Sequence, residues 1–132
     1  REVREPWTNI VLGDMNVEHV MRAAEILAAH PLASKFDFIR SEFYLYEILP
    51  KGISKGAVLP KLAQHLGIDM KKTVAIGDYN NDIEMIKYAD VGFCPSNATD
   101  DVKKVADVVL DVSCEESAIS AVIDYIFKIT NN

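Results

Sequence analysis

The second part of the chain alternates short apolar runs with amphipathic stretches, and this alternation constrains the fold more than any other feature. Three apolar runs predict short buried strands, at 73–76, 91–93 and 108–110. Apolar residues at helical spacing predict the intervening helices, at 54–66, 82–87, 99–104 and from Ser113 onward. Strands separated by helices pair in parallel through right-handed crossovers, so the sequence predicts an α/β fold with a parallel sheet flanked by helices.

The first part of the chain has a different pattern. A strand at 8–12 precedes a helix that Asn16 caps and that ends at His30-Pro31, and two further strands follow at 36–40 and 43–49. Pro50-Lys51-Gly52 then breaks the pattern, so we place a domain boundary there, between residues 1–49 and residues 50–132.

Individual residues predict where two of the helices in the second part of the chain begin, bend or end. Pro60 removes an amide inside the first of them and predicts a bend or a shortened first turn, whereas Gly67 is expected just past its end. Ser113 and Glu116 form an S-x-x-E capping box and predict the start of the last helix.

Composition excludes several kinds of partner. A formal net charge of −6 over 132 residues argues against nucleic acid and against anionic membranes, both of which attract a basic surface. The sequence contains no run of 18 apolar residues, so it predicts no transmembrane helix. Cys94 and Cys114 lack clustered ligands for zinc; we expect two reduced thiols in a cytoplasmic protein, with a disulfide between them as the alternative.

An acidic string follows the strand at 73–76. It reads Gly77-Asp78-Tyr79-Asn80-Asn81-Asp82 and stands at the carboxyl end of a predicted parallel strand, where ligands bind in such sheets. Asp78 and Asp82 offer carboxylate oxygens of the kind that Mg²⁺ prefers. The alternative is a polar strand-to-helix turn in which an Asn or Asp side chain caps the helix.

Lys55 is the second candidate. It lies at the start of a predicted helix, where the macrodipole favours negative rather than positive charge, and this conflict suggests that Lys55 faces an anion. Gly56 would let a phosphate approach closely. The alternative is a solvated surface lysine.

Together these strings resemble the haloacid dehalogenase superfamily, in particular its Cof-type sugar-phosphate phosphatases. Residues 47–56 (EILPKGISKG) look like the family's return from cap to core and its lysine motif, and residues 74–82 (VAIGDYNND) look like its acidic motif. Residues 95–98 (PSNA), with Val102-Lys103 and Ala106-Asp107, are similar to its downstream loop and helix. The resemblance covers residues 47–128 as part of a Rossmann-like core, and residues 1–46 are consistent with the trailing half of an α/β cap.

The resemblance implies a mechanism and roles for particular residues. An aspartate attacks phosphorus, and water hydrolyses the resulting aspartyl-phosphate, while Mg²⁺ and a lysine neutralise the transferring group. Asp78 would bind Mg²⁺, and Asp82 would be a second acidic position, acting directly or through water. Lys55 would contact the nucleophile and the phosphate, Asn81 would contact the phosphate, and Asn97 would line the same mouth as a substrate-binding residue.

The sequence departs from the family at its first motif. No two aspartates are spaced by two, so the D-x-D motif that supplies the nucleophile is absent, and the family's Ser/Thr motif has no match either. Gly13-Asp14-Met15-Asn16 lacks the N-D pair of the acidic motif. We therefore expect the C-terminal portion of a longer phosphatase, inactive alone, whose parent hydrolyses a small phosphorylated metabolite. Two alternatives stay open: a non-catalytic binding module and a phosphosugar mutase relative.

The missing first strand also bears on assembly. In the family it lies beside the strand that ends at Asp78, so its absence leaves an apolar strand with an unpaired edge. We therefore expect a homodimer, or a rearranged pairing, through this exposed sheet edge.

Overall fold

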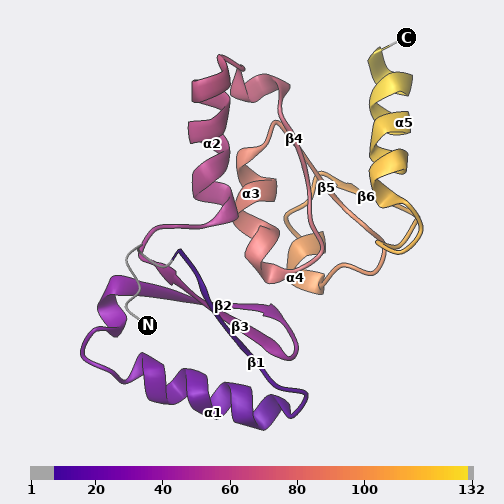
Figure 1. Cartoon of the computed structure of the whole chain (residues 1–132). Coiled ribbons are helices and arrows are strands. Elements are labelled where there is room, and N and C mark those ends of the chain that lie inside the picture. The colour runs from indigo at the N-terminus through magenta and orange to yellow at the C-terminus, as the bar shows by residue number, and fades with distance from the viewer. Residues whose placement is uncertain (1–7, 131–132) are drawn as a thin grey trace. The chain divides into compact units, whose positions relative to one another are not determined.

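A computed structural model describes residues 8–130 and divides the chain into two compact units (Figure 1). The first unit ends at Ser54 and the second begins at Lys55. The sequence starts its second domain at Pro50, five residues earlier, because the proline–glycine break is the visible signal. The structural division lies instead where the next helix starts.

The first unit is a three-stranded antiparallel sheet with one long helix. Its strands are β1 (Ile10–Gly13), β2 (Phe36–Glu42) and β3 (Leu45–Pro50), in the order β1-β3-β2. Helix α1 (Val17–Ala28) contacts β3, and the short 3₁₀ helix η1 (Ala33–Lys35) leads into β2. Val20 and Ala24 of α1 and Ile48 of β3 are buried and form the small core of this unit.

A polar contact fixes the end of this sheet. Asp37 of β2 accepts hydrogen bonds from Lys51 Nζ at 2.6 Å and from the Gly52 amide at 2.7 Å, just after β3 ends. Gly52 has φ of +76°, a left-handed conformation that glycine adopts without steric cost. Both hydrogen bonds lower the pKa of Asp37, and the bond from Lys51 has the larger effect.

The second unit confirms the predicted parallel α/β architecture. Strands β4 (Val74–Ile76), β5 (Val91–Cys94) and β6 (Val108–Val109) form one parallel sheet in the order β4-β5-β6. Four α-helices and two 3₁₀ helices connect and flank the strands (Figure 1): α2 (Lys55–Leu66), η2 (Met70–Lys72), η3 (Asn80–Asp82), α3 (Ile83–Tyr88), α4 (Asp100–Lys103) and α5 (Ala118–Thr130).

Successive residues of β5 point into two separate apolar cores on opposite faces of the sheet. Phe93 is fully buried with Ala118 and Val122 of α5, and its ring meets Tyr125 edge to face at 5.3 Å. Cys94 is fully buried with Ile86 of α3 and with Val102 of α4. The sheet is therefore covered on both faces, as parallel sheets require. Both cysteines are free, and burial raises the pKa of the Cys94 thiol.

Helix α2 contains Pro60 and is followed by Gly67, the two residues from which the sequence analysis drew its expectations. The helix runs from Lys55 to Leu66 with Pro60 inside it, and the bend predicted at Pro60 stays a prediction. Gly67 has φ of +68°, and the amides of Ile68 and Gly67 donate to the carbonyls of Ala63 and Gln64, which is the Schellman arrangement. Gly67 therefore ends the helix as predicted.

The last helix begins later than the sequence suggests. Glu116 accepts from the Ser113 amide at 2.9 Å, as in a capping box, but the residues between them form turns and α5 starts at Ala118. Ser117 precedes it with φ of +62°, the one positive φ at a non-glycine residue within 8–130. The prediction of a helix from Ser113 is therefore wrong by about one turn, because the motif closes a separate turn. None of the described helices combines the length and apolar character needed to cross a membrane.

The Asp37 contact leads to a pH prediction. Because its pKa is lowered in the folded state, its contribution to stability is present above the ordinary carboxyl range and is lost as the pH falls through the lowered pKa. Replacing Lys51 with alanine removes the larger cause and should raise the titration midpoint of Asp37, measured by carboxyl carbon NMR. Lys35→Ala is the matched control and should leave it unchanged; an unmoved midpoint in Lys51→Ala would contradict the assignment.

Candidate functional site

The candidate site lies at the carboxyl end of β4. The Gly77 amide donates to the Phe93 carbonyl at 3.2 Å, and the chain then leaves the sheet. The Asp82 side chain packs so closely over Gly77 that a β-carbon there would collide with it. Glycine at this position is therefore what allows the turn to fold back onto the strand end.

Asp82 is the buried centre of this turn. The residue is 4% exposed, and its Oδ1 accepts a hydrogen bond from Lys55 Nζ at 2.6 Å. Its Oδ2 accepts from the amides of Asp78, at 3.2 Å, and Tyr79, at 3.5 Å. One carboxylate therefore holds the lysine and shapes the loop that presents Asp78.

Lys55 is brought to the turn by the packing of α2 on α3. The neighbouring Gly56 is buried, and a β-carbon there would collide with Glu84 of α3. This glycine therefore serves close helix packing rather than the phosphate approach suggested by the sequence. About half of the Lys55 side chain is exposed, so its ammonium group is bound to Asp82 on one side and accessible on another. Asp82 also resolves the conflict between a lysine and a helix N-terminus.

A cavity of about 480 Å³ adjoins this ion pair. Its volume is in the range of small-molecule sites. The residues that line it come from five segments of the second unit: Lys55, Ile76, Gly77, Asp78, Asp82, Met85, Pro95, Cys114, Ser117, Ala118 and Ile119. The cavity thus combines an ammonium group and two carboxylates with apolar walls.

The structure brings together three of the five residues that the sequence singled out. Lys55, Asp78 and Asp82 line the cavity, whereas Asn81 and Asn97 do not. Asn81 Oδ1 is buried without a hydrogen-bond partner among the described residues. Asn97 is bound to the loop before α5: its Nδ2 donates to Cys114 Sγ at 3.1 Å, and its Oδ1 accepts from the Cys114 amide at 2.9 Å. Contacts of Asn81 and Asn97 with a substrate stay predictions.

Sequence reasoning missed three residues near the site. Cys114 and Ser117 line the cavity although they lie far along the chain from Asp78. The Thr99 amide donates to the Asp78 carbonyl at 3.0 Å, and its hydroxyl donates to Asn80 Oδ1 at 2.9 Å. The sequence marked Thr99 only as the start of a predicted helix, and no local signal marks Cys114. Both residues reach the site through the pairing of the parallel strands.

The donor set fits part of a magnesium site. Asp78 and Asp82 supply hard oxygen atoms, but both oxygens of Asp82 already accept hydrogen bonds. Within residues 8–130 no group of three His, Cys, Asp or Glu side chains is arranged to hold a metal ion. Asp78 is therefore the better placed ligand, and a complete coordination shell needs oxygens from elsewhere.

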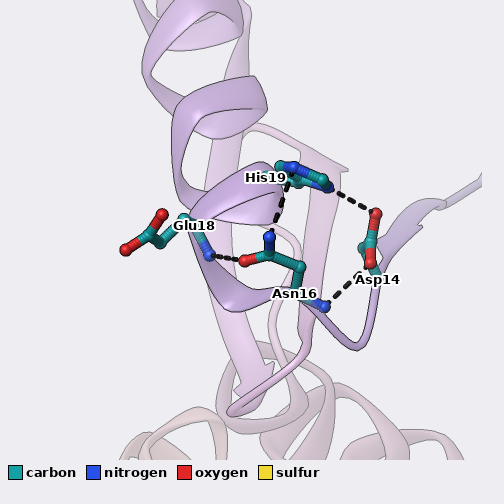
Figure 2. A network of polar contacts seen from close by, with 4 residues as sticks. All are labelled: Asp14, Asn16, Glu18 and His19. Carbon is teal, nitrogen blue, oxygen red and sulfur yellow. Dashed lines mark hydrogen bonds and ion pairs between the residues drawn. The ribbon is translucent and has the colours of Figure 1, made fainter.

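A second polar cluster lies in the first unit, at the start of α1 (Figure 2). Asn16 Oδ1 accepts from the Glu18 amide, and Asp14 accepts from the Asn16 amide at 2.8 Å. His19 pairs through Nδ1 with Asp14 at 3.0 Å and through Nε2 with Asn16 at 3.3 Å. The hydrogen bonds from the Asn16 amide and from His19 both lower the pKa of Asp14, and the Asn16 amide has the larger effect. Helix capping, as predicted for Asn16, explains these contacts.

Known proteins are similar to this chain in sequence and in fold. Residues 2–123 match the family of haloacid dehalogenase-like hydrolases. The chain is 38% identical to a phosphoglycolate phosphatase of Methanopyrus kandleri over 74% of its own length and 40% of the relative. It is 41% identical to the 5-amino-6-(5-phospho-D-ribitylamino)uracil phosphatase of Bacillus subtilis over 58% of its length and 30% of the relative. A haloacid dehalogenase-like hydrolase of Bacteroides thetaiotaomicron superposes with a TM-score of 0.78 at 29% identity, over 96% of this chain and 49% of that protein.

The role of Asp82 is open to a direct test. Asp82→Asn removes the charge that holds Lys55 and should lower the free energy of unfolding by about 1–3 kcal/mol, since the carboxylate is buried but the lysine is half exposed. The Asp78 and Tyr79 amides should also exchange hydrogen faster. Asp101→Asn, which breaks the exposed pair with Lys104, is the matched control and should change the free energy of unfolding far less, because solvent screens that pair. Equal effects of the two substitutions would argue against a central role for Asp82.

Proposed function

Because the chain belongs to the haloacid dehalogenase-like hydrolases, we propose that it forms part of the active site of a Mg²⁺-dependent phosphatase. The substrate class is a small phosphomonoester such as a sugar phosphate. One observation carries this proposal: Asp82 holds Lys55 at the mouth of a cavity that Asp78 also lines. The chain spans less than half the length of each of the three similar proteins described above, so the activity proposed is that of a longer protein.

Each residue of the proposed site has a chemical task. Lys55 places a positive charge beside the cavity, where it can neutralise the oxygens of a phosphoryl group. Asp82 keeps that ammonium group in place and is therefore a positioning residue. Asp78 is the ligand that would hold Mg²⁺, which when bound would stabilise the negative charge of the transferring group.

The nucleophile is the part that this chain does not supply. The proposed reaction passes through an aspartyl-phosphate, in which an aspartate oxygen bonds to phosphorus as the alcohol oxygen leaves, and water later releases inorganic phosphate. Asp78 and Asp82 are committed to other tasks, and no aspartates spaced by two occur in the sequence. The nucleophile therefore comes from another segment, and this chain alone is inactive in our proposal.

The absence of the D-x-D motif also favours a second candidate, a binding module that retains the fold without catalysis. Such a module would bind a phosphorylated metabolite through Lys55. It differs from the first candidate in one testable respect, because a longer protein that contains this chain would then have no phosphatase activity.

Metal binding can be measured on this chain directly. Mg²⁺ should bind weakly and shift the amide NMR signals of residues 77–82, because two carboxylates form an incomplete shell. Asp78→Ala should abolish these shifts. The adjacent acidic pair Asp100-Asp101 provides the internal control, and shifts confined to it would count against the assignment.

Activity separates the two candidates. The 132-residue chain should not hydrolyse p-nitrophenyl phosphate, since loss of a catalytic nucleophile can reduce turnover by roughly 10⁶-fold, as loss of the catalytic serine does in a serine protease. A longer protein that includes the chain should hydrolyse it, and EDTA should stop the reaction. In that protein Lys55→Ala and Asp78→Ala should each nearly abolish turnover, whereas the exposed Lys104→Ala should not. Metal-dependent turnover by the 132-residue chain itself would show that the nucleophile is misassigned.

A further inference from the structure

Thr99, at the N-cap of α4, lies between residues that are buried in the core of the second unit. Ala98, directly before it, is 5% exposed, and Val102, three residues further on, is fully buried with Ile86 and Cys94. Thr99 itself is half-buried. Because the apolar core fixes the chain on both sides of it, Thr99 can act as a rigid support for the groups that it binds.

Two polar groups of Thr99 bind the acidic loop, residues 77–82, that follows β4. Its amide donates to the Asp78 carbonyl at 3.0 Å, and its hydroxyl donates to Asn80 Oδ1 at 2.9 Å. Both distances are typical of well-formed hydrogen bonds. Thr99 lies 19 residues further along the chain than Asn80, so these bonds connect the loop after β4 to the start of α4.

Thr99 and Asp82 together hold the backbone of Asp78 on both sides. The Asp78 amide donates to Asp82 Oδ2 at 3.2 Å, whereas the Asp78 carbonyl accepts from Thr99. Both peptide groups that flank Asp78 therefore have a fixed partner, and the side-chain torsions are what remains free. A ligand that is held in this way loses less conformational entropy when it binds an ion.

Capping of α4 is the alternative role for Thr99, and it does not explain these contacts. The hydroxyl also accepts from the Val102 amide, but at 3.4 Å this is the longest of the three bonds and exceeds the usual range for an N–H donor. A helix cap uses the hydroxyl as an acceptor only. It requires neither the bond donated to Asn80 nor the amide bond to Asp78.

We propose that Thr99 is a positioning residue for Asp78: it restricts the motion of the acidic loop and so prepares the Asp78 carboxylate for a divalent cation. Thr99 does not line the cavity, so it acts through Asp78. Groups that hold a metal ligand in place change the metal affinity by roughly 10- to 100-fold when they are removed. The assignment rests on the proposed function for the identity of the cation, Mg²⁺.

Two NMR measurements on the 132-residue chain test the proposal. Without metal, nitrogen-15 relaxation should show lower order parameters at residues 78–80 in Thr99→Val, which keeps the shape of the side chain but lacks its hydroxyl. In a Mg²⁺ titration followed at the amides of residues 77–82, the same variant should raise the dissociation constant roughly tenfold. Thr99→Ser keeps the hydroxyl and should restore both values.

Thr73 provides the matched control at the opposite end of β4. Its hydroxyl donates to the Met70 carbonyl at 2.6 Å and accepts from the Asp90 amide at 3.2 Å, so Thr73→Val also removes two hydrogen bonds from a half-buried threonine. It should change neither the order parameters of the loop nor the Mg²⁺ affinity. Equal effects of Thr73→Val and Thr99→Val would overturn the proposal, as would a loop that Thr99→Val leaves equally ordered.

Asn80→Ala tests the same bond from its other side. Asn80 is exposed, so this variant removes the acceptor without disturbing the core, and it decides the proposal if Thr99→Val does not fold. Its effect on Mg²⁺ affinity should match that of Thr99→Val, and the double variant should bind no more weakly than either single variant, because both remove one bond. Additive effects would overturn the proposal.

Failure of the proposed function gives a different result. A wild-type chain in which Mg²⁺ shifts no amide of residues 77–82 would overturn the proposed metal site. The relaxation measurement without metal would still decide whether Thr99 positions the loop.

Discussion

The bond between Lys55 and Asp82 is the interaction on which the second unit depends most. It connects the first residue of α2 to the turn after β4, and the same carboxylate accepts the amides that shape the loop carrying Asp78. A buried carboxylate without such partners would be costly, so the loop, the lysine and the helix position stabilise one another. Gly77 and Gly56 make this possible, because each gives a neighbouring element room to approach.

This arrangement also explains why the lysine is chemically useful. A fully buried ion pair would leave no charge for a ligand, and a fully exposed lysine would be mobile and screened by water. Lys55 lies between these extremes: Asp82 holds one side of the ammonium group, and the cavity adjoins the other. Asp82 is thus better described as the support of the lysine than as a free metal ligand.

The strand β4 and the cavity share one residue. Ile76 belongs to both, because it is the last residue of the edge strand and part of the cavity wall. A parallel sheet in an α/β protein is usually buried at its central strands, and among residues 8–130 the strand that bears the acidic loop lies at the edge of the sheet. Any chain that pairs with β4 therefore also approaches Lys55 and Asp78.

Much of the fold could be predicted from the sequence because its signals are local. The strands at Val74, Val91 and Val108, the cap at Asn16 and the helix end at Gly67 all appear where the sequence places them, within one or two residues. The start of α5 could not be predicted in the same way. The hydrogen bond between Ser113 and Glu116 forms, yet the chain turns once more at Ser117. The backbone of Ser117 is left-handed, and a serine in the sequence does not indicate that conformation.

By itself the sequence determined the parallel α/β class and identified Lys55, Asp78 and Asp82 as candidates. Both results rest on local signals, because periodicity and the residues that follow a strand involve positions close together in the sequence. Only the tertiary structure decided what these residues do to one another. It paired Lys55 with Asp82, bound Asn97 to Cys114 instead of to the cavity, and brought Ser117 to the cavity wall. Such contacts depend on how distant segments pack, and the spacing of residues along one chain does not encode which partner a side chain meets.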